Sequence, residues 1–304
     1  MPQAYLGEIY AGVAACCWVI SATCFEAAGK RIGSLVVNLL RLLIAVALLG
    51  IICWIRRGTF LPVDAPPHVL WWIIVSGVIG FFLCDMCLFR ALVLAGARRC
   101  MLMLSLAPCF AAVLDVASGE PPTARMWLGM AITLAGVMWA ITQRSAEHET
   151  PHSRRELRIG VLLALSAALL QALGAKAAEI GLDLGNGNHY DAMAATFIRA
   201  SAGAVCFALL IAATGRAASV LAGSRHPQTM LILTLGAIAG PVIGVTLFLA
   251  SLARVQSSVT QTILATMPIL ALPVAYFFNK ERISAQAIAG TILCVIGVMI
   301  LCLR

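Results

Sequence analysis

Residues 120–138 read EPPTARMWLGMAITLAGVM, and residues 281–299 read ERISAQAIAGTILCVIGVM. In both stretches a glutamate is followed by glycines nine and sixteen positions later, and both end in Gly-Val-Met. The second stretch begins 161 residues after the first, in a chain of 304 residues. This spacing, about half the chain, predicts that the sequence contains two related halves.

Residues of uncommon type pair across the chain in the same order. The pairs are Pro108 with Pro268 (offset 160), Gly77 with Gly236 and Phe89 with Phe248 (159), Arg41 with Arg199 (158), and Gly7 and Glu26 with Gly160 and Glu179 (153). The offset changes only at predicted loops, as expected of a duplicated unit. We therefore divide the chain into a first half over 1–143, a polar linker over 144–156 and a second half over 157–304.

The composition is that of an integral membrane protein. Hydrophobic residues make up 62% of the chain, charged residues 11%, and the mean hydropathy is +0.98. Soluble domains are about 45–50% apolar and about 25% charged. A membrane-spanning helix needs roughly 20 apolar residues, so ten spans leave room only for short loops. The sequence lacks the strand-like alternation that an outer-membrane barrel requires.

The apolar stretches predict an all-α fold with ten transmembrane helices. The expected spans are 6–28, 34–55, 68–94, 98–117, 124–143, 157–180, 190–214, 228–252, 256–278 and 283–303. The first stretch lacks a basic leader and is followed by a second, so we expect a span rather than a cleaved signal peptide. Because each half has five spans, an odd number, the second half is expected to be inverted relative to the first. Inverted five-helix repeats are typical of secondary transporters.

Several function classes are disfavoured. The basic residues behind the net charge of +8 lie mostly in loops, which indicates lipid headgroups and topology rather than a nucleic-acid partner. All eleven cysteines fall in apolar segments and are expected to be reduced, the Cys84-x-x-Cys87 pair included. The sequence has no nucleotide-binding loop, metal-ligand cluster or Ser-His-acid set, so we expect no enzyme, cofactor or metal site.

The repeats resemble the drug/metabolite transporter superfamily, specifically its ten-helix EamA-type branch. The resemblance covers nearly the whole chain and rests on Arg41 and Arg199, on Pro108 and Pro268, on the glutamate and spaced glycines that close each half, and on Trp18. The usual W-G pair reads Trp18-Val19 here. The resemblance implies a cavity lined by the first four spans of each half, with the fifth and tenth spans at the periphery. Family members export amino acids and other small metabolites, or carry phosphorylated sugars and nucleotide-sugars.

Charged residues within spans need a reason, because each costs at least a few kcal/mol on insertion scales. Glu26, Arg90, Asp115 and Glu179 lie near span ends, so the expectation is that they reach the interface by snorkelling. Asp85 lies deeper. Val78, Phe82, Asp85 and Phe89 have the spacing of one helix face. Asp85 is expected to bind a substrate ammonium, to carry a coupling proton, or to pair with Lys176 or Arg41.

The two matched arginines, Arg41 and Arg199, are expected to have different roles. Arg41 has Asn38 one turn earlier on its face, which favours a place in the substrate site. For Arg199 a structural role, bracing a helix end or binding backbone carbonyls, is favoured over carboxylate recognition. Lys176 is a further intramembrane cation and a site candidate.

Prolines and small residues indicate where helices break. Pro108 and Pro268 occupy matching mid-helix positions, and broken helices at symmetric positions point to the substrate site of a carrier. Gly236, Gly240 and Gly244 form a small-residue stripe next to Pro241, which suits either a bending element or tight packing.

The polar neighbours of the paired prolines complete the predicted pocket. Met101 and Ser105 share a face with Pro108, and Ser257 and Gln261 share the matching face with Pro268, with Thr262 adjacent. Trp18 and Gln171 correspond through the offset of 153. A pocket with aromatic residues, methionine and few hydrogen-bonding groups suits a small amphipathic organic solute.

Two indicators of orientation disagree. Loops after odd-numbered spans hold 12 Lys and Arg and the other side holds 5, which places both termini outside. The resemblance implies cytoplasmic termini.

The sequence therefore predicts a secondary transporter that exports a small organic metabolite, with amino acids as candidates, across a bacterial cytoplasmic membrane. Proton coupling is one option, and uniport or exchange are the others. The alternatives are an exchanger of phosphorylated sugars or nucleotide-sugars, and a scaffold or lipid-modifying enzyme. The expected partners are the solute and the bilayer, and a homodimer is left open.

Overall fold

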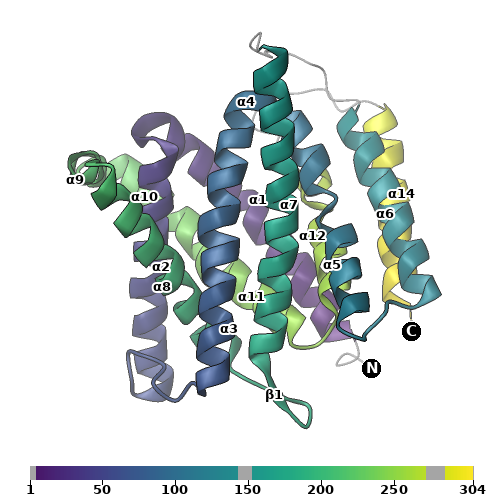
Figure 1. The fold of residues 1–304 in the computed structure, drawn as a ribbon, viewed down its shortest axis with the longest axis horizontal. Coiled ribbons are helices and arrows are strands. Elements are labelled where there is room, and N and C mark those ends of the chain that lie inside the picture. The colour runs from purple at the N-terminus through teal and green to yellow at the C-terminus, as the bar shows by residue number, and fades with distance from the viewer. Residues whose placement is uncertain (1–4, 143–152, 272–284, 304) are drawn as a thin grey trace.

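The computed structural model describes residues 5–142, 153–271 and 285–303, and this part of the chain is almost entirely helical. It also contains a short antiparallel hairpin, in which β1 (Asp183–Gly185) pairs with β2 (Asn188–His189). Gly185, Asn186 and Gly187 in its turn all have positive φ, which glycine and asparagine adopt most readily. The hairpin lies at the end of the bundle where both chain termini are found (Figure 1).

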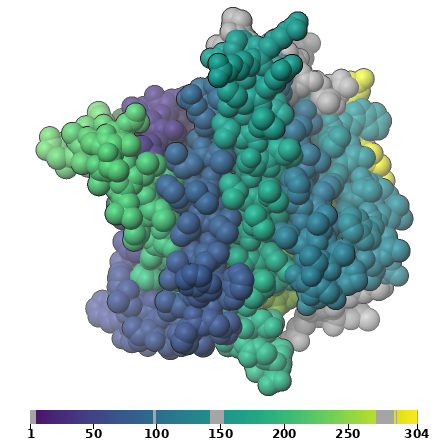
Figure 2. Space-filling view, viewed as in Figure 1, coloured from purple at the N-terminus to yellow at the C-terminus, as the bar shows by residue number. Residues whose placement is uncertain are grey.

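Each half contains the predicted order of helices. The first half comprises α1 (Leu6–Ile32), α2 (Ser34–Arg57), α3 (Pro67–Gly77), the π-helix η2 (Val78–Leu83), α4 (Cys84–Leu104), α5 (Ala107–Ala117) and α6 (Ala124–Thr142). The second half comprises α7 (Arg154–Leu182), α8 (Ala192–Ala213), α9 (Ala217–Ser224), α10 (Pro227–Ala237), the π-helix η3 (Ile238–Gly244), α11 (Val245–Leu252), α12 (Ser257–Leu264) and α14 (Ala285–Cys302). The short α9 lies within an expected loop and protrudes from the bundle (Figure 2).

Eight helical segments of the described chain are long and apolar enough to cross a membrane. They match the first eight predicted spans, and the break between the third and fourth falls at Gly96, where the backbone leaves the helical region. The predicted ninth span, 256–278, continues into residues outside the described ranges. The tenth corresponds to α14, whose apolar stretch Ile288–Cys302 is shorter. The protein is thus an all-helical, multi-pass membrane protein, and the count of ten stays a prediction.

The two halves pack on each other through equivalent contacts. A Cβ atom built on Gly7 of α1 would meet Val255 and Arg254, and one built on Gly160 of α7 would meet Ala95 and Leu94. Both pairs of neighbours differ by 160 positions, so each half places its first helix against the same point of the other half. In Figure 1, α1 starts at the end of the bundle that holds the termini, whereas α7 finishes there. This is the inversion expected from an odd number of spans.

Both mid-helix prolines break their helices in the same way. Before Pro108, the amide of Ser105 donates to Met101 and that of Leu106 to Met103. Before Pro268, the amide of Ala265 donates to Gln261 and that of Thr266 to Ile263. In each case the chain leaves α-geometry for one turn and then starts a new helix with the proline in its first turn, where a missing amide N–H costs nothing.

The third and eighth spans each contain a π-helical segment at matching positions, η2 and η3. Only η3 contains a proline, Pro241, so proline alone does not explain the pair. A π-helical turn widens the helix and changes which side chains share a face. The expectation that Val78, Phe82, Asp85 and Phe89 share one face assumed α-helical spacing, which does not hold through η2.

The peripheral pair α6 and α14 is joined through the repeated glycines. Gly136 lies against the backbone of Cys294 and Gly290, and Gly297 lies against that of Thr133. The two helices lie side by side at one edge of the bundle (Figure 1). The glycines that reveal the repeat in the sequence therefore allow close backbone approach between the fifth span and the last helix.

Candidate functional site

A cavity of about 270 Å³ is lined by residues of both halves. Its α1 residues belong to the C-terminal half of that helix, which starts at the end of the bundle that holds the termini, so the cavity lies toward the other end. Its walls come from the C-terminal half of α1, from both sides of the Pro108 break, from the middle of α7 and from both sides of the Pro268 break. Its lining is mostly apolar, and the polar side chains in it are Thr23, Glu26, Ser105, Gln171 and Gln261. Such a lining suits a small solute with an apolar body and a few polar groups.

Six of the predicted site residues line this cavity: Met101, Ser105, Pro108, Gln171, Gln261 and Pro268. The broken helices bring them together, because each break places two helix ends and the residues around them on the cavity wall. The Nε2 amide of Gln261 donates to the backbone oxygen of Gln171 at 3.3 Å, which links the ninth span to α7. The Ser105 hydroxyl donates to its own helix, at Leu102.

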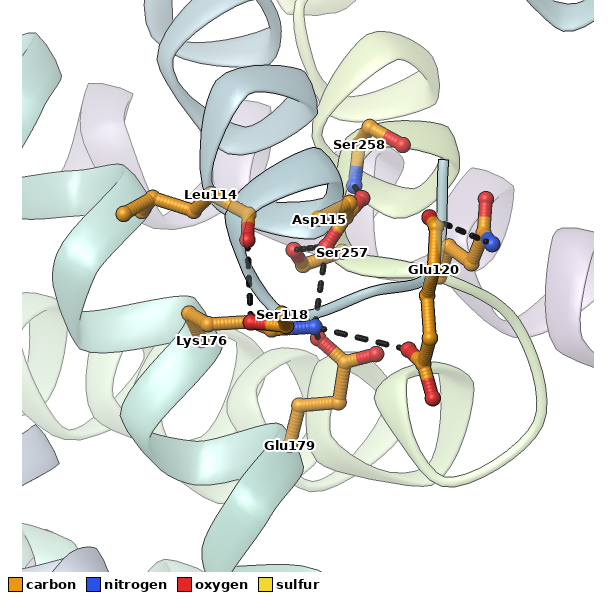
Figure 3. Close-up of polar contacts among 9 residues, drawn as sticks. Leu114, Asp115, Ser118, Glu120, Lys176, Glu179, Ser257 and Ser258 are labelled. Atoms are coloured by element: carbon orange, nitrogen blue, oxygen red, sulfur yellow. Dashed lines mark hydrogen bonds and ion pairs between the residues drawn. The ribbon is translucent and has the colours of Figure 1, made fainter. Parts of the chain in front are cut away.

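A second group of polar residues lies near the C-terminal ends of α5 and α7 and at the start of α12 (Figure 3). The Lys176 ammonium lies 3.0 Å from Asp115, 3.1 Å from Glu179 and 3.5 Å from Glu120. The hydroxyl of Ser257 and the amide of Ser258 donate to the Asp115 carboxylate at 2.9 and 3.0 Å. We refer to these six residues as the Lys176 cluster. It ties α5, α7 and the start of α12 together.

Asp115 corrects one sequence-based expectation. Its proximity to a span end predicted snorkelling to the interface, but the residue is 0% exposed. Its carboxylate instead accepts from the backbone amide of Ser258 in the first turn of α12, which would otherwise have no partner within its own helix. Glu179 is also held in the cluster by Lys176. Glu26 behaves differently, because its side chain is 65% exposed and pairs with Lys30 on its own helix.

Asp85 forms an ion pair with Arg41, one of the partners that the sequence analysis considered. The two side chains are 15% and 11% exposed, and the Arg41 guanidinium also lies over the Phe25 ring, 5.1 Å from its centroid. Arg199 approaches the same pair from α8, and its guanidinium lies over the rings of Phe81 and Phe248. Lys176 belongs to its own cluster instead.

The remaining predicted residues are not among those that line the cavity. Trp18 packs on Phe248 with ring centroids 5.5 Å apart, and Phe82 packs on Phe207 at 5.1 Å. Asn38 is buried, Phe89 is half-buried, and the Thr262 hydroxyl donates to Ser258. Gly240 lies against Ser21, whose hydroxyl donates to Gly236, and Pro241 is buried within η3. Gly240 thus serves the close packing of η3 on α1.

The sequence analysis missed Thr23 and Glu26 as cavity residues and Asp115, Glu120 and Ser258 as members of the cluster. The internal repeat of the sequence could have identified Thr23 and Glu26. Thr23 and Glu26 correspond to Lys176 and Glu179 through the offset of 153, so both pairs occupy equivalent positions at opposite ends of the pathway between the halves.

Two related, inverted helical halves with a cavity lined by both form the architecture of many membrane transporters. The model of the EamA-like transporter family matches this sequence twice, over residues 5–142 and 158–303. The chain belongs to this family, and it is a multi-pass membrane transporter.

The fold has also been seen before. A solved structure described only as "Crystal structure of protein" is similar to this chain, with a TM-score of 0.73 and 19% sequence identity over 97% of this chain and 95% of that chain. At this identity the similarity concerns the fold alone. A comparison with curated proteins finds none that matches this chain.

Proposed function

We propose that this protein is a secondary transporter that exports a small organic metabolite across the bacterial cytoplasmic membrane by alternating access, with amino acids as the first candidates. The observation that supports this proposal most strongly is the difference in structure between the two ends of the bundle. A cavity lined by both broken helices lies toward one end, and the Lys176 cluster joins three helices at the other. This is the arrangement expected of a carrier open on one side only.

The cavity residues are the proposed substrate contacts. Ser105, Gln171 and Gln261 offer hydrogen bonds, and Met101 offers an adaptable apolar surface. Helix breaks expose backbone carbonyls next to these side chains. A substrate with an apolar body and one or two polar groups would satisfy this set. Trp18, Asn38, Phe82, Phe89 and Thr262 are proposed to shape the site from behind the cavity wall.

Opening the other end requires the Lys176 cluster to separate. Its ion pairs cross between α5 and α7, and its hydrogen bonds cross between α5 and α12, so none of these helices can move apart without breaking them. The small-residue packing of η3 on α1 and the breaks at Pro108 and Pro268 are the proposed points of bending.

Asp85 is the proposed coupling group if transport is driven by protons. It faces Arg41 from α2 and Arg199 from α8, and Cys84 precedes it on its own helix. Protonation would weaken its pair with Arg41 and so connect charge to helix position. Replacing Asp85 by asparagine is expected to abolish the pH dependence of transport while the protein still folds.

The test is solute flux in proteoliposomes over a panel of amino acids, sugars and phosphorylated sugars, preceded by thermal-shift screening of the same panel. Export of at least one solute by the wild type, with a pH dependence that Asp85→Asn removes, is the expected result. Absence of flux for the whole panel would favour a scaffold or a lipid-modifying enzyme. Unchanged flux at every pH in Asp85→Asn would remove Asp85 from the mechanism.

A further inference from the structure

Arg199 is a buried cation whose hydrogen-bonding capacity is largely unused. It lies in α8, is 6% exposed, and its guanidinium lies 5.2 Å from the ring centroid of Phe81 and 5.3 Å from that of Phe248. Its Nε and Nη1 groups have no hydrogen-bond partner among the described residues. The expected structural role, binding backbone carbonyls, is therefore not what these two donors do. Each buried donor without a partner costs about 1–3 kcal/mol, and more when it is charged.

The charges around Arg199 do not balance. Asp85 is the carboxylate that acts on Arg199, but it is already paired with Arg41. The Nε group of Arg41 and the Oδ1 atom of Asn38, on the same face of α2, are likewise buried without a partner among the described residues. Two guanidinium groups and one carboxylate leave one uncompensated positive charge inside a membrane-spanning bundle. A site of this kind is stabilised by an anion that supplies the missing charge.

The geometry around Arg199 favours a flat group with a single charge. A guanidinium presents its donors in a planar fork that matches a carboxylate, and the two aromatic rings beside it form an apolar surround that suits a flat group. Gly80 lies in η2, and a Cβ atom at this position would collide with Nη2 of Arg199. Glycine at position 80 therefore leaves room for the Arg199 guanidinium. A net charge of one suits a carboxylate better than a doubly charged phosphate.

Cys84, which acts on Arg199, connects this arginine site to the cavity. The Sγ atom of Cys84, the residue before Asp85, lies 3.7 Å from Oε1 of Gln171, and Gln171 is part of the cavity lining. Phe25, under Arg41, precedes the cavity residue Glu26. We propose that the open donors of Arg199 bind the carboxylate group of the transported solute, with Asp85 as the internal anion that holds Arg41 in its absence. This inference rests on the proposed transport function and names its substrate class as a monocarboxylate, zwitterionic amino acids included.

The test measures binding to the full-length protein in lipid nanodiscs, by thermal shift and calorimetry, so it does not depend on flux. The probes are acetate and 3-phenylpropionate, with 3-phenylpropionamide as the uncharged analogue and inorganic phosphate as the dianion, all at one ionic strength. The wild type is expected to be stabilised by the carboxylates and not by the amide, with phosphate weaker. Arg199→Gln should weaken carboxylate binding about tenfold or more, the value of one charge-assisted hydrogen bond.

Two further variants separate binding from structure. Asp85→Asn removes the competing internal anion, so its affinity for carboxylates is expected to rise several-fold. A purely structural pair predicts lower stability and no such gain. Arg254→Gln is the matched control, because Arg254 also lies over a ring, that of Tyr10, away from this site, and carboxylate binding should be unchanged. If Arg199→Gln does not fold, carboxylate binding is measured instead in Arg199→Lys and Asp85→Asn.

The inference is overturned if neither the wild type nor Asp85→Asn is stabilised by any carboxylate, or if the amide binds as well as the acid. It is also overturned if carboxylate preference survives in Arg199→Gln. Carboxylate-selective binding without flux in proteoliposomes would leave this site standing and contradict the transport proposal. Flux without carboxylate selectivity would support the transport proposal and contradict the carboxylate site at Arg199.

Discussion

The two ends of the bundle occupy equivalent positions in the repeat and yet differ in their polar side-chain contacts. At one end, Lys176 of α7 pairs with Asp115 of α5 and with Glu179 on its own helix, and Asp115 accepts a hydrogen bond from the start of α12. At the other, Thr23 donates only to the backbone of α1, and Glu26 pairs with Lys30 on the same helix. The two halves have the same arrangement of helices but different side chains at matched positions. As a result, the Lys176 cluster connects three helices at one end, and the cavity lies toward the other end. The asymmetry needed for a one-sided opening is therefore present in the side chains.

The largest expected effect comes from breaking the joined end. Lys176→Met leaves three carboxylates facing one another without a cation, one of them fully buried, so the free energy of unfolding should fall by about 3–5 kcal/mol. Thermal unfolding in nanodiscs measures this. The matched substitution Thr23→Met, at an exposed position, should change stability by less than about 0.5 kcal/mol. Equal losses for the two variants would mean that the ends do not differ as described.

An intermediate effect is expected where the two halves contribute symmetrically. Gly136→Leu and Gly297→Leu each place a side chain against the backbone of the opposite helix in the α6–α14 pair, and a Cβ on Gly136 would lie 2.5 Å from the Cys294 nitrogen. Both should lower the free energy of unfolding by about 1–3 kcal/mol or more, and by similar amounts. Gly12→Leu is the control, because a Cβ there meets nothing within 4 Å. A loss confined to one of the two glycines would contradict the symmetric packing at this edge.

The smallest expected effect concerns the matched residues Ser105 and Ala265 at the two helix breaks, both on the cavity wall. Ser105→Ala removes a hydroxyl that donates to Leu102, so stability should change by about 1 kcal/mol or less. Apparent affinity for the transported solute should fall a few-fold. Flux at several solute concentrations measures it. Ala265→Ser, which adds a hydroxyl at the equivalent position, should leave stability within the same range, and a large loss there would show that the two breaks are not equivalent.

Sequence reasoning predicted what depends on repetition. The pairing of Pro108 with Pro268 predicted two matching breaks and, with the side chains on the same helix faces, five of the residues that line the cavity. The spaced glycines identified both helices of the α6–α14 pair. It could not predict contacts between helices. Asp115 lies close to a span end in the sequence, and only the packing of α12 against α5 buries it. The π-helix η2 contains no proline that would indicate it in the sequence. The helix face assigned to Asp85 therefore assumed α-helical spacing, which does not hold through η2.

The most direct test of the central claim uses two alanines that correspond in the repeat. Ala22 lines the cavity, and Ala175, next to Lys176, is 0% exposed. Each is replaced by cysteine in separate variants, and modification by a charged, water-soluble thiol reagent is followed in nanodiscs by peptide mass spectrometry, with the native cysteines as internal references. The account predicts rapid modification of Ala22→Cys, protection of Ala175→Cys, and loss of that protection when Lys176→Met is added. Equal rates at the two positions, or faster modification of Ala175→Cys, would contradict it.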